Sequence, residues 1–173
     1  MELIGNYADW IRPELLDIIK TKPGDTTPVW QPERWSGRPE WDEARERARY
    51  GYSDNKHFFQ QFNQFSKDMQ GYDIVLPEIP GDNRQTMWWI VKLLPGQMQS
   101  MHFDPHLIEY KNPQRYTMFL EDWRPGHIYV WGDQYIANYR AGDFYKWSDP
   151  MCYHGCVNIG YEDRYTLQIT TVD

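Results

Sequence analysis

The sequence lacks the features that mark exported, membrane-spanning and generally DNA-binding proteins. Among its 173 residues no run of about 18 apolar residues occurs, and residues 1–20 do not combine a basic stretch with a following apolar run. The net charge is −7, so the chain as a whole does not attract phosphate backbones or anionic lipid. We therefore expect a soluble, cytoplasmic protein with neither a membrane nor nucleic acid as its partner.

Cysteine is also scarce. The chain has two cysteines, Cys152 and Cys156, which stand on either side of His154. On an extended segment their side chains project to the same side but lie too far apart for easy bridging, so free thiols are expected. A Cys-x-His-x-Cys zinc cluster is the alternative. Structural zinc normally takes four protein ligands, however, and the chain has no second cysteine pair.

The length of the chain fits one domain, and its first 80 residues predict mostly helices and loops. A proline followed by apolar residues on one face predicts a helix over residues 13–19, which Pro23 and Gly24 would end. Residues 26–39 predict an irregular loop, residues 40–49 a solvated helix, and residues 54–69 a helix that packs on a sheet. Most aromatic side chains should fill the core; those that can instead lie over a pocket are Trp30, Trp35 and Trp41.

After Gly71 the pattern changes to short strand-like runs. Turn signals that contain Gly or Pro separate these runs. Many short strands at such spacing predict an antiparallel sandwich or barrel. The expected strands cover residues 87–94, 116–120, 127–131, 135–139, 143–147, 154–159 and 164–171.

Four residues in the second half have the chemistry of an oxygen-activating iron site. Two histidines and a carboxylate suit a divalent iron that keeps coordination positions open, and a following arginine suits a ligand with a carboxylate. Side chains two apart on a strand point the same way, so His102 and Asp104 can hold one ion. The other two members of the set are His154 and Arg164, and the same alternation places Thr166 on the face of Arg164.

The segment from residue 87 to residue 171 resembles the iron(II) and 2-oxoglutarate-dependent dioxygenases. The motifs that carry the resemblance are His102-Phe103-Asp104, the distal His154, and Arg164-Tyr165-Thr166-Leu167-Gln168-Ile169. The resemblance implies a mainly β double-stranded β-helix, or jelly-roll, barrel braced by N-terminal helices. It divides the single domain into a support, residues 1–80, and a core that carries the metal site, residues 81–173.

The resemblance also implies an activity and roles for the residues. His102, Asp104 and His154 would hold Fe(II) and form the catalytic centre, while Arg164 would pair with the far carboxylate of 2-oxoglutarate. With O2, such a small stand-alone hydroxylase converts an unactivated C–H bond of a protein side chain or small molecule, and it releases succinate and CO2. Halogenating relatives carry a small residue in place of the metal carboxylate, so Asp104 favours hydroxylation.

Further contacts are expected around these residues. Thr166 falls where many members of the family have a hydroxyl that shares the co-substrate carboxylate. Tyr116 is a further candidate for this contact, with Asn158 and Gln99 as competitors. His106 is expected to orient a ligand or to lie in a loop rather than to bind the metal. The sequence does not identify the primary substrate or the oligomeric state.

Two other classes of function share parts of this pattern. A cupin-like metalloenzyme without a keto-acid co-substrate could use the same His and Asp ligands, but it would not need a buried arginine aimed at a second carboxylate. A non-catalytic jelly-roll module that binds carbohydrate through Trp or Tyr would bind no iron and would tolerate substitution of His102.

Overall fold

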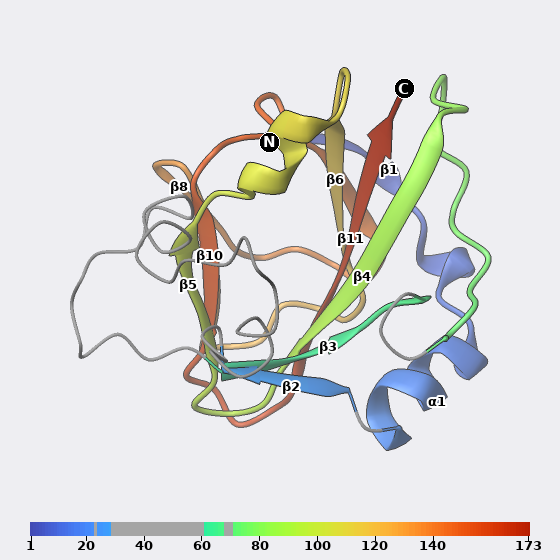
Figure 1. Ribbon diagram of the computed structural model, residues 1–173. Helices are drawn as coiled ribbons and strands as arrows, with labels where there is room; N and C mark the ends of the chain where they lie inside the picture. The colour runs from blue at the N-terminus through green and yellow to red at the C-terminus, as the bar shows by residue number, and fades with distance from the viewer. Residues whose placement is uncertain (23, 29–60, 68–70) are drawn as a thin grey trace, which may run out of the picture.

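The computed structural model describes residues 1–22, 24–28, 61–67 and 71–173, and most of its ordered elements are β-strands (Figure 1). No helix in these residues is long and apolar enough to cross a membrane. Helix α1 (Pro13–Thr21) and two short 3-10 helices, η1 (Ala8–Trp10) and η2 (Pro105–Glu109), accompany the strands. The strands are β1 (Glu2–Asn6), β2 (Asp25–Pro28), β3 (Gln61–Phe65), β4 (Gln85–Leu93), β5 (Met98–His102), β6 (Gln114–Phe119), β7 (His127–Trp131), β8 (Gln134–Ile136), β9 (Asp143–Lys146), β10 (His154–Asn158) and β11 (Arg164–Val172).

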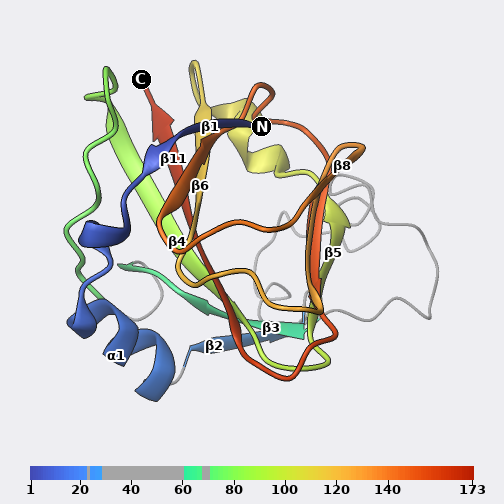
Figure 2. The same ribbon diagram turned by 180° about the vertical axis from the view of Figure 1, so that it is seen from behind.

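Strands β4 to β11 form two antiparallel four-stranded layers. The order is β4-β11-β6-β9 in the first layer and β5-β10-β7-β8 in the second. The chain therefore passes from one layer to the other at most connections, and Figures 1 and 2 show the two layers on opposite sides of the molecule. This interleaved order is that of the double-stranded β-helix, so the predicted jelly roll is confirmed.

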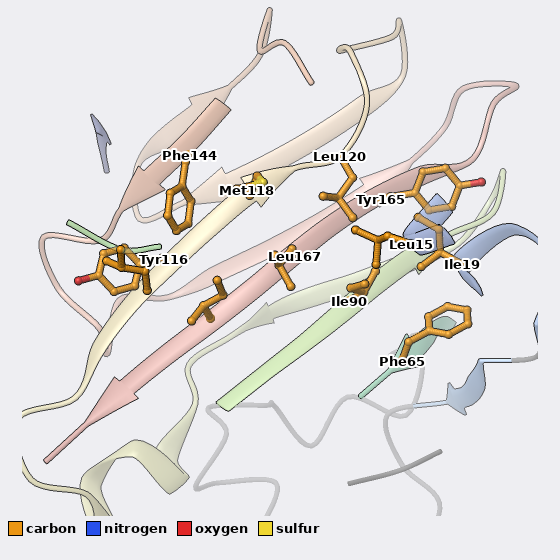
Figure 3. Packing of buried hydrophobic residues seen from close by; sticks show 12 residues of the cluster. Leu15, Ile19, Phe65, Ile90, Tyr116, Met118, Leu120, Phe144, Tyr165 and Leu167 are labelled. Carbon is orange, nitrogen blue, oxygen red and sulfur yellow. The ribbon is translucent and has the colours of Figure 1, made fainter. Parts of the chain in front are cut away.

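The first layer has a hydrophobic core on each of its faces. On the inner face, Val91 and Phe119 pack in one cluster with Tyr129 and Cys156 of the second layer. On the outer face, the side chains of Leu15 and Ile19 from α1 belong to a second cluster, drawn in Figure 3. These two apolar side chains are the buried residues of α1, and they attach the helix to the sheet.

Strand β11 shows how its sequence divides between these two cores. It lies between β4 and β6, and all nine of its residues are buried. Tyr165, Leu167 and Ile169 alternate with the polar residues of the strand, and their side chains belong to the outer core. Arg164 and Thr166 consequently point to the inner side, between the two layers.

The predicted helix over residues 13–19 is confirmed as α1. Pro13 occupies the first turn, where a missing N–H is tolerated, and the helix ends at Thr21 before Lys22 becomes extended. The described residues of the first 80 nevertheless contain more strand than expected, because β1 adds to the free edge of β9 and β2 pairs with β3.

Two expectations for this N-terminal part are wrong. Gln61–Phe65, expected inside an amphipathic helix, forms β3, and Asp25–Pro28 forms β2 where a loop was expected from residue 26. Strand β3 pairs with the edge of β4 and touches β5 through Gln61 and Met98. The open edge of β4 offers unpaired N–H and C=O groups, and pairing with them overrides a local helical pattern. The remaining expectations, a loop over 29–39, helices over 40–49 and 54–60, and the roles of Trp30, Trp35 and Trp41, lie outside the described residues.

The turn between β6 and β7 depends on one glycine. Gly126 has φ of 96°, a conformation that residues with a side chain rarely adopt. A Cβ at this position would lie 2.3 Å from the backbone nitrogen of Gly160. The two loops at this end of the barrel can therefore pack together only with glycine at position 126.

Candidate metal centre and carboxylate site

Three buried side chains meet where β5 ends and β10 begins. His102 is the last residue of β5, Asp104 follows two residues later, and His154 is the first residue of β10 and the register partner of His102. Asp104 Oδ1 lies 3.6 Å from His102 Nε2, and Asp104 Oδ2 lies 3.5 Å from His154 Nε2. One ligand atom from each residue lies within 4.8 Å of the others, so the cluster can hold a metal ion.

The backbone orients both imidazole rings toward this point. His102 Nδ1 is 2.7 Å from the carbonyl oxygen of Ser100, and His154 Nδ1 is 3.1 Å from the carbonyl oxygen of Cys152. A carbonyl can only accept, so Nδ1 carries the proton and Nε2 presents its lone pair toward Asp104.

Electrostatics keep both rings in the form that binds metals. Burial lowers the pKa of His102 against the opposing effect of Asp104. The pKa of His154 falls further, because its burial is complete and because His102 and Arg115 also disfavour its charged form. Both imidazoles are therefore neutral at neutral pH, as metal ligands must be.

Arg115 also belongs to this centre, and the sequence reasoning missed it. The side chain is 1% exposed, and its Nη1 donates a hydrogen bond to Asp104 Oδ2. It projects from β6 to the inner side, as do Thr117 and Phe119. A lone arginine in the otherwise mostly apolar run of β6 was the available signal, because a charge in such a strand needs a buried partner.

Arg164, the predicted carboxylate ligand, is fully buried at the start of β11. Among the described residues its Nε, Nη1 and Nη2 make no well-aligned hydrogen bond, although the Tyr139 hydroxyl and the Cys156 thiol lie close enough to interact weakly with it. Its Cζ lies 5.3 Å from the ring centroid of Tyr129 and 5.7 Å from that of Phe119, so aromatic rings flank the cation. Burial lowers the pKa of Arg164, but neighbours including Cys156 and Tyr139 outweigh it, and the pKa is raised overall. Burial raises the pKa values of Cys156 and Tyr139, so both are uncharged at neutral pH and do not neutralise the guanidinium, which an anionic ligand could do.

Glu121 does not supply the missing negative charge. Burial raises its pKa to about 8, against the opposing charge of Arg164, so most of this carboxyl is neutral at neutral pH. Its Oε2 accepts a hydrogen bond of 2.9 Å from the backbone N–H of Tyr165, while Oε1 has no partner among the described residues. His127 begins β7, in the expected strand over 127–131, and its Nδ1 lies 3.8 Å from Glu121 Oε1.

Three polar side chains line the inner side near Arg164 or the metal centre. The hydroxyls of Thr166 and Tyr139 are buried and make no well-aligned hydrogen bond within the described part of the chain. Arg164 opposes the effect of burial on the pKa of Tyr139 through its charge and a weak side-chain interaction, so this hydroxyl lies close to the guanidinium. Gln99 lies beside the metal centre, with Nε2 at 3.5 Å from His102 Nε2, and its Oε1 accepts from Cys156 Sγ at 3.7 Å.

Tyr139 was not predicted as a site residue. It follows β8, in the connection to β9, and its ring stacks on Phe119 with the centroids 3.6 Å apart. In the sequence it ends an expected strand over 135–139. The observed β8 ends at Ile136, so strand alternation could not place this hydroxyl.

The expectation that Tyr116 contacts the co-substrate is wrong. Its side chain points into the outer core, where Figure 3 shows it, and its hydroxyl donates to Asp82 Oδ2 at 2.9 Å. Alternate residues of a strand face opposite sides, and on β6 the inward set is Arg115, Thr117 and Phe119. The strand was recognised from the sequence, but its inward face was assigned incorrectly.

The two other expectations near this site have different outcomes. Asn158 is used in the turn after β10, because its amide donates to the carbonyl oxygens of Leu93 and Glu162 and its Oδ1 accepts from Gly160. It has no capacity left for a ligand on that amide nitrogen. The backbone of His106 lies in η2, whereas its side chain is outside the described structure.

Both cysteines are free thiols, in agreement with the prediction. Cys156 is buried in the inner core, and burial raises the pKa of its thiol. Cys152 is partly exposed, and its carbonyl oxygen accepts the hydrogen bond from His154 Nδ1. The Cys-x-His-x-Cys segment thus contributes its histidine, and not its thiols, to the cluster.

No protein-family profile matches the chain, and a search of curated proteins found no match. Similar solved structures include a protein of Thermus thermophilus, with 16% identity, 77% of this chain and 97% of that chain covered, and a TM-score of 0.42. A predicted oxalate decarboxylase of Thermotoga maritima has 16% identity, with 65% of this chain and 82% of that chain covered, and a TM-score of 0.42. The Cnp3 cupin domain of Schizosaccharomyces pombe has 14% identity, 71% and 74% coverage, and a TM-score of 0.42. Similarity at this level carries no information about ligand or activity, and the strand order itself identifies the chain as a double-stranded β-helix protein.

Proposed function

We propose that the protein is an Fe(II)- and 2-oxoglutarate-dependent dioxygenase. In this proposal it hydroxylates an unactivated C–H bond of a small molecule or a protein side chain, and succinate and CO2 are the co-products. The observation that carries the proposal is Arg164, a fully buried guanidinium whose three nitrogens make no well-aligned hydrogen bond in the described residues. A metal centre alone gives no reason for this second, separate cation.

The donor set of the metal centre suits iron with open coordination positions. Two neutral imidazoles and one carboxylate would supply three ligands to the ion and would leave its other coordination positions for a chelating co-substrate and oxygen. The three residues are buried, and backbone carbonyls fix both rings before any metal arrives. Such preorganisation fits a catalytic ion, because a ligand set held in place keeps one geometry while the other positions exchange.

The surroundings of Arg164 suit a carboxylate. A guanidinium presents parallel N–H groups that match the two oxygens of a carboxylate. The hydroxyls of Thr166 and Tyr139 are two further buried groups without partners in the described part of the chain, and both can donate to the same anion. Together the three residues would convert several unsatisfied buried groups into one satisfied cluster when a carboxylate binds.

Each residue then has a defined task in the reaction. His102, Asp104 and His154 would hold iron, which supplies the oxygen-activating redox chemistry when bound. Arg164, Thr166 and Tyr139 would fix the far carboxylate of 2-oxoglutarate and so set its distance from the metal. The rings of Phe119 and Tyr129 beside Arg164 exclude water, and in a dry site the ion pair is stronger than in solvent.

An anaerobic titration tests the proposal. Metal-free protein is titrated with Fe(II) and then with 2-oxoglutarate, and the weak visible charge-transfer band of a keto acid chelated to ferrous iron is recorded. We expect the band in the parent protein and its loss in His102→Ala. His127→Ala is the matched control, because it removes another buried histidine whose ring bonds Glu162 and not the cluster.

Two results would overturn the proposal, and each points to a different class. Iron binding without the band indicates a metalloenzyme that uses no keto acid. Failure to bind iron at all, with a folded protein, indicates a binding module of the jelly-roll type. A band that survives in His102→Ala would reject the ligand assignment.

A further inference from the structure

Arg115 is the second buried arginine between the two layers, and it contacts the metal cluster directly. Its Nη1 donates to Oδ2 of Asp104, the same oxygen that lies 3.5 Å from His154 Nε2. The other carboxylate oxygen, Oδ1, faces His102 Nε2 at 3.6 Å. The two oxygens of the one acidic ligand therefore have different surroundings.

Aromatic rings fix the position of the Arg115 guanidinium. Its Cζ lies 4.0 Å from the ring centroid of Trp147 and 5.5 Å from that of Trp89. Trp147 is itself anchored, because its Nε1 donates to Thr117 Oγ1 at 2.9 Å, and Thr117 donates to Gln168 Oε1 at 2.9 Å. These contacts therefore hold the Arg115 guanidinium in a fixed position beside Asp104.

The same indole also contacts a metal-binding residue. The ring of Trp147 lies 4.7 Å from that of His154 at an angle of 74°, an edge-to-face contact. Movement of Trp147 would therefore disturb His154 and the Arg115–Asp104 pair together. Arg115 and Trp147 thus support the metal cluster together, and the Arg115–Asp104 contact is not an isolated ion pair.

The Arg115 contact affects both the denticity and the charge of the centre. Because Oδ2 already accepts from the guanidinium, its electron density is partly engaged, and two-oxygen coordination by Asp104 becomes less favourable than coordination through Oδ1 alone. Imidazoles bind metals in their neutral form, so two imidazoles, one carboxylate and one guanidinium sum to zero charge, and a divalent ion bound here keeps its full attraction for an anionic chelator. Without Arg115 the carboxylate could take two coordination positions and would halve the net charge of the ion.

We propose that Arg115 is a positioning residue that restricts Asp104 to one-oxygen coordination and so preserves the open positions for an anionic chelating co-substrate. The inference rests on the proposed function, because it assigns Arg115 a role in binding 2-oxoglutarate at the metal. It predicts that loss of Arg115 weakens the binding of 2-oxoglutarate but not the binding of the metal. A general loss of structure would weaken both.

The test uses Co(II) as an air-stable probe of the full-length protein. The visible d–d spectrum of Co(II) reports coordination number, a competing chelator gives the metal affinity, and the spectral change on adding 2-oxoglutarate gives the co-substrate affinity. In Arg115→Met, whose side chain is shorter and uncharged, we expect Co(II) to bind at least as tightly as in the parent. We expect the affinity for 2-oxoglutarate to fall about 10- to 100-fold, by analogy with the loss of metal affinity or activity that follows removal of groups that orient metal ligands.

Two further variants keep the proposal falsifiable if Arg115→Met is poorly folded. Arg115→Lys retains a positive charge but not the planar fork, and we expect a co-substrate affinity between those of the parent and the Met variant. Arg84→Met is the matched control, because it removes the arginine of another Arg–Asp pair, in which Nη2 lies 2.8 Å from Asp82 Oδ2. It should change neither affinity.

The outcomes separate the two proposals. If the parent protein binds Co(II) but does not respond to 2-oxoglutarate, the proposed function fails whatever Arg115 does. If the parent binds both and the Met and Lys variants bind both equally well, the role of Arg115 is rejected. Parallel weakening of both affinities would show a purely structural role and would also reject it.

Discussion

Replacing Arg164 with methionine should change stability and co-substrate binding in opposite directions. Methionine is unbranched, flexible and uncharged, and although it is shorter than arginine it can fill much of the space between the rings of Tyr129 and Phe119. In the metal-free, ligand-free protein the substitution removes a buried cation that has no hydrogen-bond partner among the described residues. In the ligand-bound protein it removes the group that holds the carboxylate.

Both effects have a magnitude that follows from the burial of Arg164. Replacing buried ionic groups with apolar side chains of similar volume often stabilises a protein by about 1–4 kcal/mol. In a chain of 173 residues, each kcal/mol raises the melting temperature by about 2–4 °C. Truncating one partner of a buried, hydrogen-bonded charge pair costs about 2–5 kcal/mol of affinity, which is a loss of about 30-fold or more in the dissociation constant.

Thermal unfolding with and without ligand measures both effects in one experiment. Without ligand, Arg164→Met should melt at least about 2 °C above the parent. With Co(II) and 2-oxoglutarate at about 100 times its dissociation constant, the parent should gain about 2.7 kcal/mol, and the variant should not follow it. Arg164→Lys keeps the charge without the planar guanidinium, so it should lose part of the affinity for 2-oxoglutarate. Its charge stays buried, so its ligand-free melting temperature should not rise as in Arg164→Met. A ligand-free Arg164→Met that melts well below the parent would show that the guanidinium is already compensated and would refute the reasoning.

Three other substitutions test the surrounding structure. Burial raises the pKa of Glu121 from 4.5 to about 8, so between these pH values the folded protein holds a proton that the unfolded chain releases, and stability falls as the pH rises. The free energy of unfolding, measured with urea at pH 5 and at pH 8, should therefore differ less between the two pH values in Glu121→Gln than in the parent. Leu167 is fully buried in the outer core, and changing it to Ala should lower the free energy of unfolding by about 2–5 kcal/mol. An altered Co(II) affinity in this variant would contradict the separation of the two cores. Gly126→Ala should lower the melting temperature strongly, because its Cβ would meet Gly160 N at 2.3 Å, and an unchanged melting curve would show that the turn can shift.

Much of the barrel and of the metal cluster could be predicted because their signals are local. The strand β11 alternates polar and apolar residues, so the inward direction of Arg164 and Thr166 followed from the outward direction of Leu167. His102 and Asp104 are two residues apart, and the pair needed only one distant histidine to complete a ligand set. In these cases neighbouring residues carried the information, and the fold only brought the segments together.

The residues that were missed or misplaced depend on contacts between distant segments. Tyr116 and Arg115 are adjacent, and which of them faces inward is fixed by the pairing of Tyr116 with Ile169 of β11, 53 residues away. Arg115 was recognisable as important only once Asp104 lay beside it. Likewise, β3 was misread as helical because its pairing partner, β4, supplies the reason for its extended form.

The interleaved strand order has a consequence for how the protein reaches its native state. Of the paired strands among β4 to β11, only β7 and β8 are neighbours along the chain, and the longest closure joins Gln85 to Val172. Chains dominated by such distant pairings lose much entropy before their contacts form, and they fold slowly, on a scale of about milliseconds to seconds. His102 meets His154 only after β5 has paired with β10, so the full ligand set is assembled late. A metal ion should therefore stabilise the finished barrel and slow its unfolding, and it should do little to accelerate folding.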